Sequence, residues 1–111
     1  MPRDALYLEQ MLSAIAKIES FTVGITADAF ETDQKTQSAV ILQLLLIGEL
    51  AKKVSEETRA AIALPWKEIA GFRDRAVHDY FDIDLDIVWN TVQTDIPELK
   101  KQLGHVEPKV S

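Results

Sequence analysis

The chain has 111 residues, which is enough for one domain with a single hydrophobic core but too few for two. It contains no cysteine, so disulfide bonds and thiolate metal sites are excluded. The formal net charge of −6 speaks against a protein that coats nucleic acid indiscriminately.

No segment of the sequence is typical of secretion or of a membrane span. The first residues, MPRDALYLEQ, are charged and lack the apolar core of a signal peptide. The most apolar run covers only 12 residues from Ala39, whereas a membrane helix needs about 20. We therefore expect a cytoplasmic protein with no membrane partner.

The charge is unevenly distributed along the chain. Residues 51–75 carry six basic and four acidic groups, while residues 1–50 and 76–111 each carry three basic and seven acidic groups. The only net-positive segment could hold an anion on an otherwise acidic protein. The mixed charges of ordinary helix surfaces explain these counts equally well.

The first half of the chain is predicted to form two helices. Apolar residues recur at three- and four-residue spacing in the first, which Asp4 can cap and which fades near 21–24. The second starts at Asp28, which has an acidic residue three positions on, pauses around 32–33 and runs to about Val54.

The middle of this second helix, residues 39–51, is apolar almost all round. A strand is the competing interpretation, but the length, the leucine and alanine content and the lack of alternation favour a helix. A small domain offers too few neighbours for such a helix, so part of its surface is predicted to face a second copy in a homodimer.

The next two predicted helices are separated by a proline. Ser55 caps a short helix that extends to about Ala63. Leu64 and Pro65 break it, and Pro65 or Trp66 begins a further helix, because proline suits the first turn.

The last predicted helix begins near Asp82 or Asp84 and meets Pro97, where it kinks or restarts with Asp95 as a cap. Its buried residues are expected to be Leu85, Val88, Trp89 and Val92. The sequence thus predicts an all-α, antiparallel bundle of about five helices, with one domain over residues 1–104 and a disordered tail over 105–111.

The stretch FRDRAVHDYF, residues 72–81, gathers the side chains best suited to chemistry. On a helix, Arg73 and His78 lie about 140° apart around the axis, and the long arginine can curl toward the histidine. The helix C-terminal end and the acidic residues that follow favour a protonated imidazole. Arginine can grip a phosphate, and RNA supplies its own 2′-hydroxyl nucleophile, so this pair suits phosphodiester cleavage without a metal ion.

Two neighbours in this stretch could support the pair. Asp74 precedes His78 by four residues and Arg75 precedes it by three, so both can lie near it on a helix. The competing interpretation is structural, because a histidine near a helix end is usually a cap or packed, and arginine–aspartate neighbours usually form a surface ion network.

Glu49 is a carboxylate on the apolar helix. Such a group is either paired with an arginine or lysine or part of a site at a dimer interface, and pairing is the favoured interpretation.

The spacing of Arg73, His78 and Tyr80 resembles the RX4HXY signature of HepT-like toxins in the HEPN superfamily. The polar Asp74 directly after the arginine also matches that superfamily. The resemblance covers roughly residues 4–103 and includes the segments KTQSAVILQLLLIGELAKKVSEE, PWKEIAGFRDRAVHDYF and IDLDIVWNTVQTDIPEL.

This resemblance implies a HEPN-like homodimer in which the motifs of two subunits face each other across a cleft. It implies a metal-independent ribonuclease with Arg73 and His78 as the catalytic pair. We expect no cofactor, and we expect Asp74, Arg75 and Glu49 to have supporting roles. The resemblance also implies a type VII-like toxin–antitoxin pair, in which a minimal nucleotidyltransferase antitoxin silences the toxin by transferring AMP to the motif tyrosine, here Tyr80.

Three hypotheses of function therefore follow from the sequence. The first is a toxin that cleaves tRNA or mRNA. The second is a non-catalytic module that binds nucleotide or RNA and docks a nucleotidyltransferase. The third is a purely structural helical dimer, which requires nothing of residues 72–81.

Overall fold

The computed structural model describes residues 2–78 and 80–104, and within them every side chain except those of Pro2, Arg75, Val77, His78 and Tyr80. The described elements are all helical: α1 (Pro2–Thr22), α2 (Ala27–Thr32), α3 (Gln34–Lys53), α4 (Glu56–Ala61), α5 (Trp66–His78), the 3-10 turn η1 (Tyr80–Asp82), α6 (Leu85–Asn90), the π-helical segment η2 (Thr91–Asp95) and α7 (Ile96–Gly104). The prediction of an all-α fold is confirmed.

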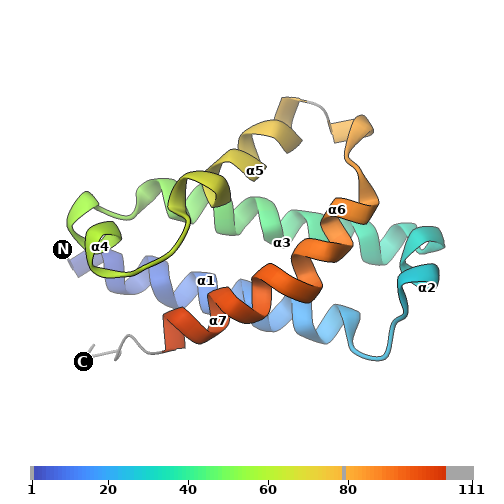
Figure 1. The fold of residues 1–111 in the computed structure, drawn as a ribbon, viewed down its shortest axis with the longest axis horizontal. Helices are drawn as coiled ribbons and strands as arrows, with labels where there is room; N and C mark the ends of the chain where they lie inside the picture. Colours follow the sequence, from blue (N-terminus) through green and yellow to red (C-terminus); the bar gives the residue numbers. More distant parts are fainter. Residues whose placement is uncertain (1, 79, 105–111) are drawn as a thin grey trace.

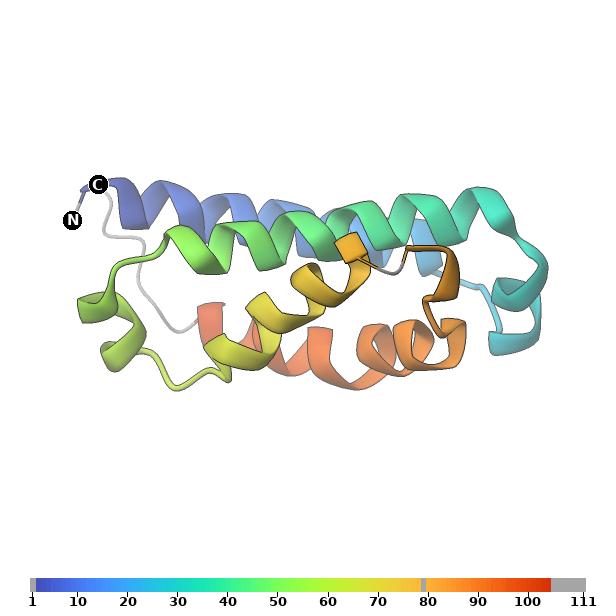
Figure 2. The ribbon, with the colours of Figure 1, turned by 90° about the horizontal axis from the view of Figure 1, so that it is seen from above.

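Helix α3 is the centre of the bundle. It lies beside α1 along the length of the molecule and also packs against α5, which crosses it obliquely (Figures 1 and 2). The run from α6 through η2 to α7 lies on the same side of the α1–α3 pair as α5 (Figure 2), with α7 against α1. Helix α3 therefore shares its surface between the core and the helix that carries the FRDRAVHDYF stretch.

The core explains why α3 is so apolar. Its buried side chains include Val40 and Ile47, which belong to one core cluster with residues of α1, α6 and α7. Phe30 of α2 is also fully buried, with its ring centroid 5.0 Å from that of Trp89. Burial of each such side chain stabilises the fold by roughly 1.5–3 kcal/mol.

The helix caps in the first half differ in part from the prediction. Asp4 lies inside α1 and is buried, and it accepts hydrogen bonds from the backbone N–H and hydroxyl of Ser55 instead of capping its own helix. The cap of α2 is Thr26, not Asp28, because the Thr26 hydroxyl accepts the N–H of Ala29. The predicted pause at residues 32–33 is confirmed, and Asp33 caps α3.

In the second half, Ser55 caps α4 as predicted, although α4 ends at Ala61 and not at Ala63. Helix α5 begins at Trp66, and Asp84 caps α6 by accepting the N–H of Asp86. The four residues predicted to be buried in the last helix belong to the core or pack against it.

The predicted interruption before Pro97 has an unexpected form. Residues 91–95 form a π-helical segment, and the helix continues into α7 with Ile96 in the right-handed helical conformation. Asp95 therefore lies inside the π-helical segment and is not the cap of a restarted helix. A π turn lets the backbone accommodate a residue that cannot donate its N–H without ending the helix.

Part of the apolar surface of α3 is exposed, as at Leu42 and Leu46. The homodimer that this surface suggests stays a prediction. None of the helices in the described ranges is long and apolar enough to cross a membrane. The predicted disordered tail, residues 105–111, lies outside the described residues.

Candidate active site

Helices α3 and α5 approach each other closely at Gly48. A Cβ atom added to Gly48 would lie 2.5 Å from the Cβ of Arg73 and 3.0 Å from the carbonyl oxygen of Ile69. Real Cβ atoms do not come so close to backbone and side-chain stems, so only glycine permits this crossing. The crossing places the first half of the Arg73 side chain directly against α3.

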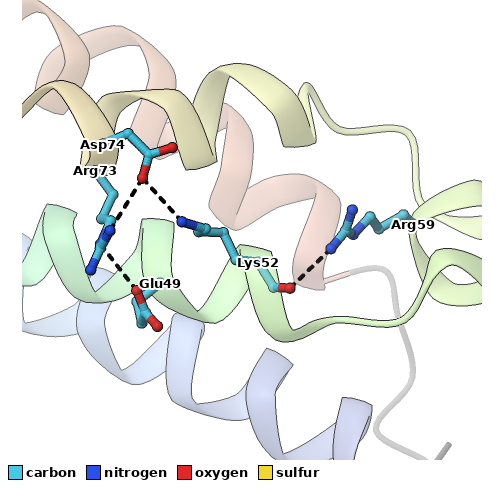
Figure 3. Close-up of polar contacts among 5 residues, drawn as sticks. All are labelled: Glu49, Lys52, Arg59, Arg73 and Asp74. Atoms are coloured by element: carbon cyan, nitrogen blue, oxygen red, sulfur yellow. Dashed lines mark hydrogen bonds and ion pairs between the residues drawn. The ribbon is translucent and has the colours of Figure 1, made fainter.

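Four charged side chains surround this crossing, two from each helix (Figure 3). Nε of Arg73 lies 3.0 Å from Oε1 of Glu49, and Nη1 of Arg73 lies 3.2 Å from Oδ1 of Asp74. Nζ of Lys52 lies 3.0 Å from the same Oδ1 atom. Two cations and two carboxylates therefore form one network with no net charge.

The contact between Glu49 and Arg73 is not a well-aligned hydrogen bond. Oε1 of Glu49 is buried and accepts no hydrogen bond from the described residues, although Nε of Arg73 is within ion-pair distance. The favoured interpretation of Glu49, as a carboxylate paired with a cation, is confirmed. Its supporting role in a reaction stays a prediction.

The Asp74 carboxylate is held in its ionised form. Hydrogen bonds from Lys52 and then from Arg73 lower the pKa of Asp74, and they outweigh partial desolvation, which would raise it. The side chains remain accessible to solvent, with exposed fractions of 51% for Asp74, 42% for Lys52 and 32% for Arg73. A ligand can therefore reach the network, and ion pairs at this exposure contribute little to the stability of the fold.

The C-terminal end of α3, which carries Lys52, is fixed by Arg59 of α4. Nη2 of Arg59 donates to the carbonyl oxygen of Lys52, and Nε donates to that of Val54, each at 3.0 Å (Figure 3). These bonds satisfy carbonyls that the helix end leaves unpaired. They also hold the backbone from which Lys52 extends.

The structure places the backbone of the remaining motif residues but not their side chains. Helix α5 continues without a break to His78, so Arg73 and His78 lie on one helix, with a rise of about 7.5 Å between them. Tyr80 begins η1. The side chains of Arg75, His78 and Tyr80 lie outside the described part of the chain.

A separate cavity of about 310 Å³ lies between α3, α5 and the α6–α7 run. It is lined mainly by apolar side chains, among them Ile47, Phe72 and Leu99. Glu49, Arg73 and Asp74 are not among its lining residues, so this cavity is distinct from the charged network.

Comparison with known proteins shows the family to which this chain belongs. Residues 11–106 match the family model described as ribonuclease HepT-like. The chain belongs to the ribonuclease HepT-like family. The resemblance of its motif to HepT-like proteins of the HEPN superfamily is thereby confirmed.

Individual relatives support this membership. A "Probable ribonuclease HepT" of Thermococcus cleftensis is 44% identical over 95 residues, which are 85% of this chain and 86% of that protein. A "Putative RNase" of Caldanaerobacter subterraneus is 36% identical over 104 residues, 93% of each chain. A "Gamma-glutamylcyclotransferase and putative RNase" of Methanocaldococcus jannaschii is 39% identical over 99 residues, 88% of this chain but only 45% of that protein. No solved structure gives a significant match.

Within this HepT-like chain, sequence reasoning identified three members of the network, Glu49, Arg73 and Asp74, and missed two other residues. Lys52 contacts Asp74 from the neighbouring helix, and Gly48 permits the helix crossing. Lys52 belongs to the net-positive segment and lies one turn beyond Glu49 on α3, which was the only signal for it in the sequence.

Proposed function

We propose that this protein is a toxin that cleaves RNA as a metal-independent endoribonuclease, with residues 1–104 as a single HEPN-like domain that acts in the cytoplasm as a homodimer. Membership of the ribonuclease HepT-like family supports the activity. Arg73 and His78 form the catalytic pair, and Asp74, Arg75 and Glu49 support it.

The proposed chemistry needs only proton transfer and charge stabilisation. The 2′-oxygen of a ribose attacks the adjacent phosphorus, the new P–O bond forms, and the bond from phosphorus to the 5′-oxygen breaks. A neutral imidazole of His78 accepts the 2′-hydroxyl proton, and a protonated one donates a proton to the leaving 5′-oxygen. In a dimer, two copies of His78 can divide these roles across one cleft.

Arg73 stabilises the charge that grows on the phosphate oxygens in the transition state. The observation that carries the proposal is the placement of the Arg73 side chain, whose stem lies against the Gly48 crossing while about one-third of the side chain is exposed. A side chain with a fixed stem and a solvent-accessible guanidinium suits a group that must meet a phosphate in a fixed orientation. A purely structural ion pair would not require this access.

Silencing by a partner is the second part of the proposal. A minimal nucleotidyltransferase antitoxin transfers AMP to Tyr80, which lies two residues after His78. The adenylate is bulky and negatively charged, so it would repel and block an RNA phosphate. Coexpression with the neighbouring reading frame, followed by intact-mass measurement, should show additions in steps of one AMP that a Tyr80→Phe variant lacks.

The decisive test of the nuclease uses the two histidines of the chain. We expect the wild-type protein to cut tRNA or mRNA in EDTA and the His78→Ala variant to lose this activity while it keeps its helical spectrum. His105→Ala is the matched control and should cut RNA as the wild-type protein does. Cleavage that persists in His78→Ala would assign the activity to another site or to a contaminant.

One observation favours a second candidate function. Arg73 is paired with two carboxylates, as in an ordinary surface ion network. Such a network does not require catalysis, so the chain could also be a non-catalytic module that binds nucleotide or RNA through Arg73 and docks a nucleotidyltransferase. In that case the purified protein would leave RNA uncut, and Arg73→Ala would weaken binding without changing any rate.

A further inference from the structure

One oxygen atom in the network is contacted by two cations from different helices. Oδ1 of Asp74 lies 3.0 Å from Nζ of Lys52 on α3 and 3.2 Å from Nη1 of Arg73 on α5 (Figure 3). Lysine ammonium and arginine guanidinium groups that converge on one oxyanion form the kind of site that binds a phosphate oxygen. The carboxylate oxygen marks the position that such an oxygen would take.

The ion pairs that hold Asp74 in the network are weak enough for an anion to displace its carboxylate. Asp74 and Lys52 are about half exposed, so water and salt screen their ion pair. Arg73 and Asp74 are also consecutive residues of one helix, and such neighbours point in different directions. Their side chains therefore have to bend toward each other to make this contact. The contact lacks the favourable spacing of three or four residues along a helix, so an incoming anion can displace it more easily.

The opposite side of the guanidinium is held separately. Glu49 lies against Nε of Arg73, away from the Nη1 atom that contacts Asp74. Release of Asp74 would thus leave Arg73 oriented by Glu49 and by its close packing against Gly48. Lys52 would likewise keep its place, because Arg59 fixes the end of α3 from which it extends.

We propose that Lys52 is a substrate-binding residue, and that an RNA phosphate displaces the Asp74 carboxylate from its position between Lys52 and Arg73. Asp74 then acts as a built-in competitor that occupies the anion site until RNA arrives. This inference rests on the proposed function, because it assigns the second cation that binds the substrate phosphate. It also gives Asp74 a definite role. Its carboxylate competes with RNA for the two cations, so only an RNA phosphate that binds these cations more tightly can displace it.

The test compares two adjacent lysines in a His78→Ala background, in which RNA should stay intact. Lys53 is the matched control for Lys52, because it follows on the same helix but its ammonium group lies over the ring of Tyr7, 5.9 Å from the centroid. A short single-stranded RNA with a fluorescent label is titrated at several salt concentrations. Lys52→Gln should raise Kd several-fold. It should also make the fall of the logarithm of the association constant with the logarithm of salt concentration less steep, by about 0.7, which is the contribution of one phosphate contact.

Lys53→Gln should change neither quantity, and Lys52→Arg should restore both. An equal loss of affinity in Lys52→Gln and Lys53→Gln would overturn the inference, since it would show a response to overall charge alone. Circular dichroism of each variant checks that the helices are intact.

The displacement itself is tested with Asp74→Asn. Removal of the competing charge should tighten RNA binding, and the gain should be much smaller when Lys52 is already glutamine, because the vacated site then lacks one cation. If Asp74→Asn tightens binding equally with and without Lys52, the carboxylate merely repels RNA and the inference is wrong.

The inference and the proposed nuclease can fail separately. If the wild-type protein cuts RNA while Lys52→Gln binds it as tightly as Lys53→Gln, the nuclease stands and the role of Lys52 is refuted. If the wild-type protein cuts no RNA but only the Lys52 variant loses affinity, the anion site stands and the nuclease is refuted.

Discussion

Gly48 and Arg73 face each other across the contact between α3 and α5, and a single methyl group on the glycine would come within 2.5 Å of the arginine Cβ. The stem of the proposed catalytic arginine is therefore positioned by a residue that has no side chain. Substitutions at this contact should therefore affect both the packing of α3 against α5 and the proposed activity.

Gly48→Ala should destabilise the fold and lower activity together. The added methyl group forces α3 and α5 apart, and such overpacking costs about 1–3 kcal/mol, partly offset by the better helix propensity of alanine, worth about 1 kcal/mol. Urea unfolding and RNA cleavage measure the two effects. Gly104→Ala is the control, because a Cβ there meets no atom within 4 Å among the described residues. Equal behaviour of the two variants would show that the crossing is not tight.

Arg73→Lys should keep the positive charge but lose most of the cleavage activity. Lysine cannot reproduce the planar fork that binds two phosphate oxygens, and loss of one aligned donor typically lowers kcat by about 10²- to 10³-fold. Single-turnover cleavage of a defined RNA measures the change. Arg3→Lys, at an exposed position of α1, should cleave at the wild-type rate. A fully active Arg73→Lys variant would reduce the role of Arg73 to that of a point charge.

Asp4→Asn should lower stability in a pH-dependent way. Burial alone would raise the pKa of Asp4, but hydrogen bonds from Ser55 and Thr58 lower it. The ionised form therefore stabilises the fold by about 1–3 kcal/mol above the unfolded-state pKa of roughly 3.9. That contribution is lost as the pH falls through the lower folded-state value.

Urea unfolding of wild-type and Asp4→Asn proteins between pH 7 and pH 2 measures this effect. The difference in unfolding free energy should be full at pH 5–7 and should shrink toward pH 2. Asp28→Asn, at an exposed residue of α2, should show only a small difference throughout. A gap that stays constant with pH would refute the assignment of an ionised Asp4.

Asp33→Ala should destabilise the start of α3. The carboxylate accepts the backbone N–H of Thr36 at 3.0 Å and its hydroxyl at 2.6 Å. Loss of an N-cap of this kind leaves a backbone N–H at the helix start without its partner and lowers the stability of the helix. Thermal unfolding measures the loss, and Ser38→Ala, an exposed substitution inside the same helix, is the control. A loss at position 38 as large as at position 33 would indicate a general sensitivity of α3 and no cap.

The sequence was most informative where structure depends on near neighbours. Ser55 was identified as a cap because its acceptor role involves only the three residues that follow. Asp4 was misassigned because its partners, Ser55 and Thr58, lie more than 50 residues away in the chain. A helix-start signal cannot reveal a carboxylate that binds another helix.

The same distinction applies to the site. Arg73 and Asp74 stand out as adjacent members of a motif, whereas Lys52 joins them only because α3 passes beside α5. The π-helical segment before Pro97 was equally hidden, since a proline indicates an interruption but not the form that it takes. For Lys52, what the sequence lacks is the register between α3 and α5.

The central position of α3 has a consequence for how this protein can lose activity. The middle of α3 packs against α1 and carries the buried side chains of Val40, Leu44 and Ile47, so its amide protons should exchange with solvent only when the whole molecule opens. Lys52 lies one residue before the end of this helix, and its side chain is exposed. Substitutions at the charged end of α3 can therefore abolish binding while the fold persists, whereas substitutions in its buried middle would unfold the protein.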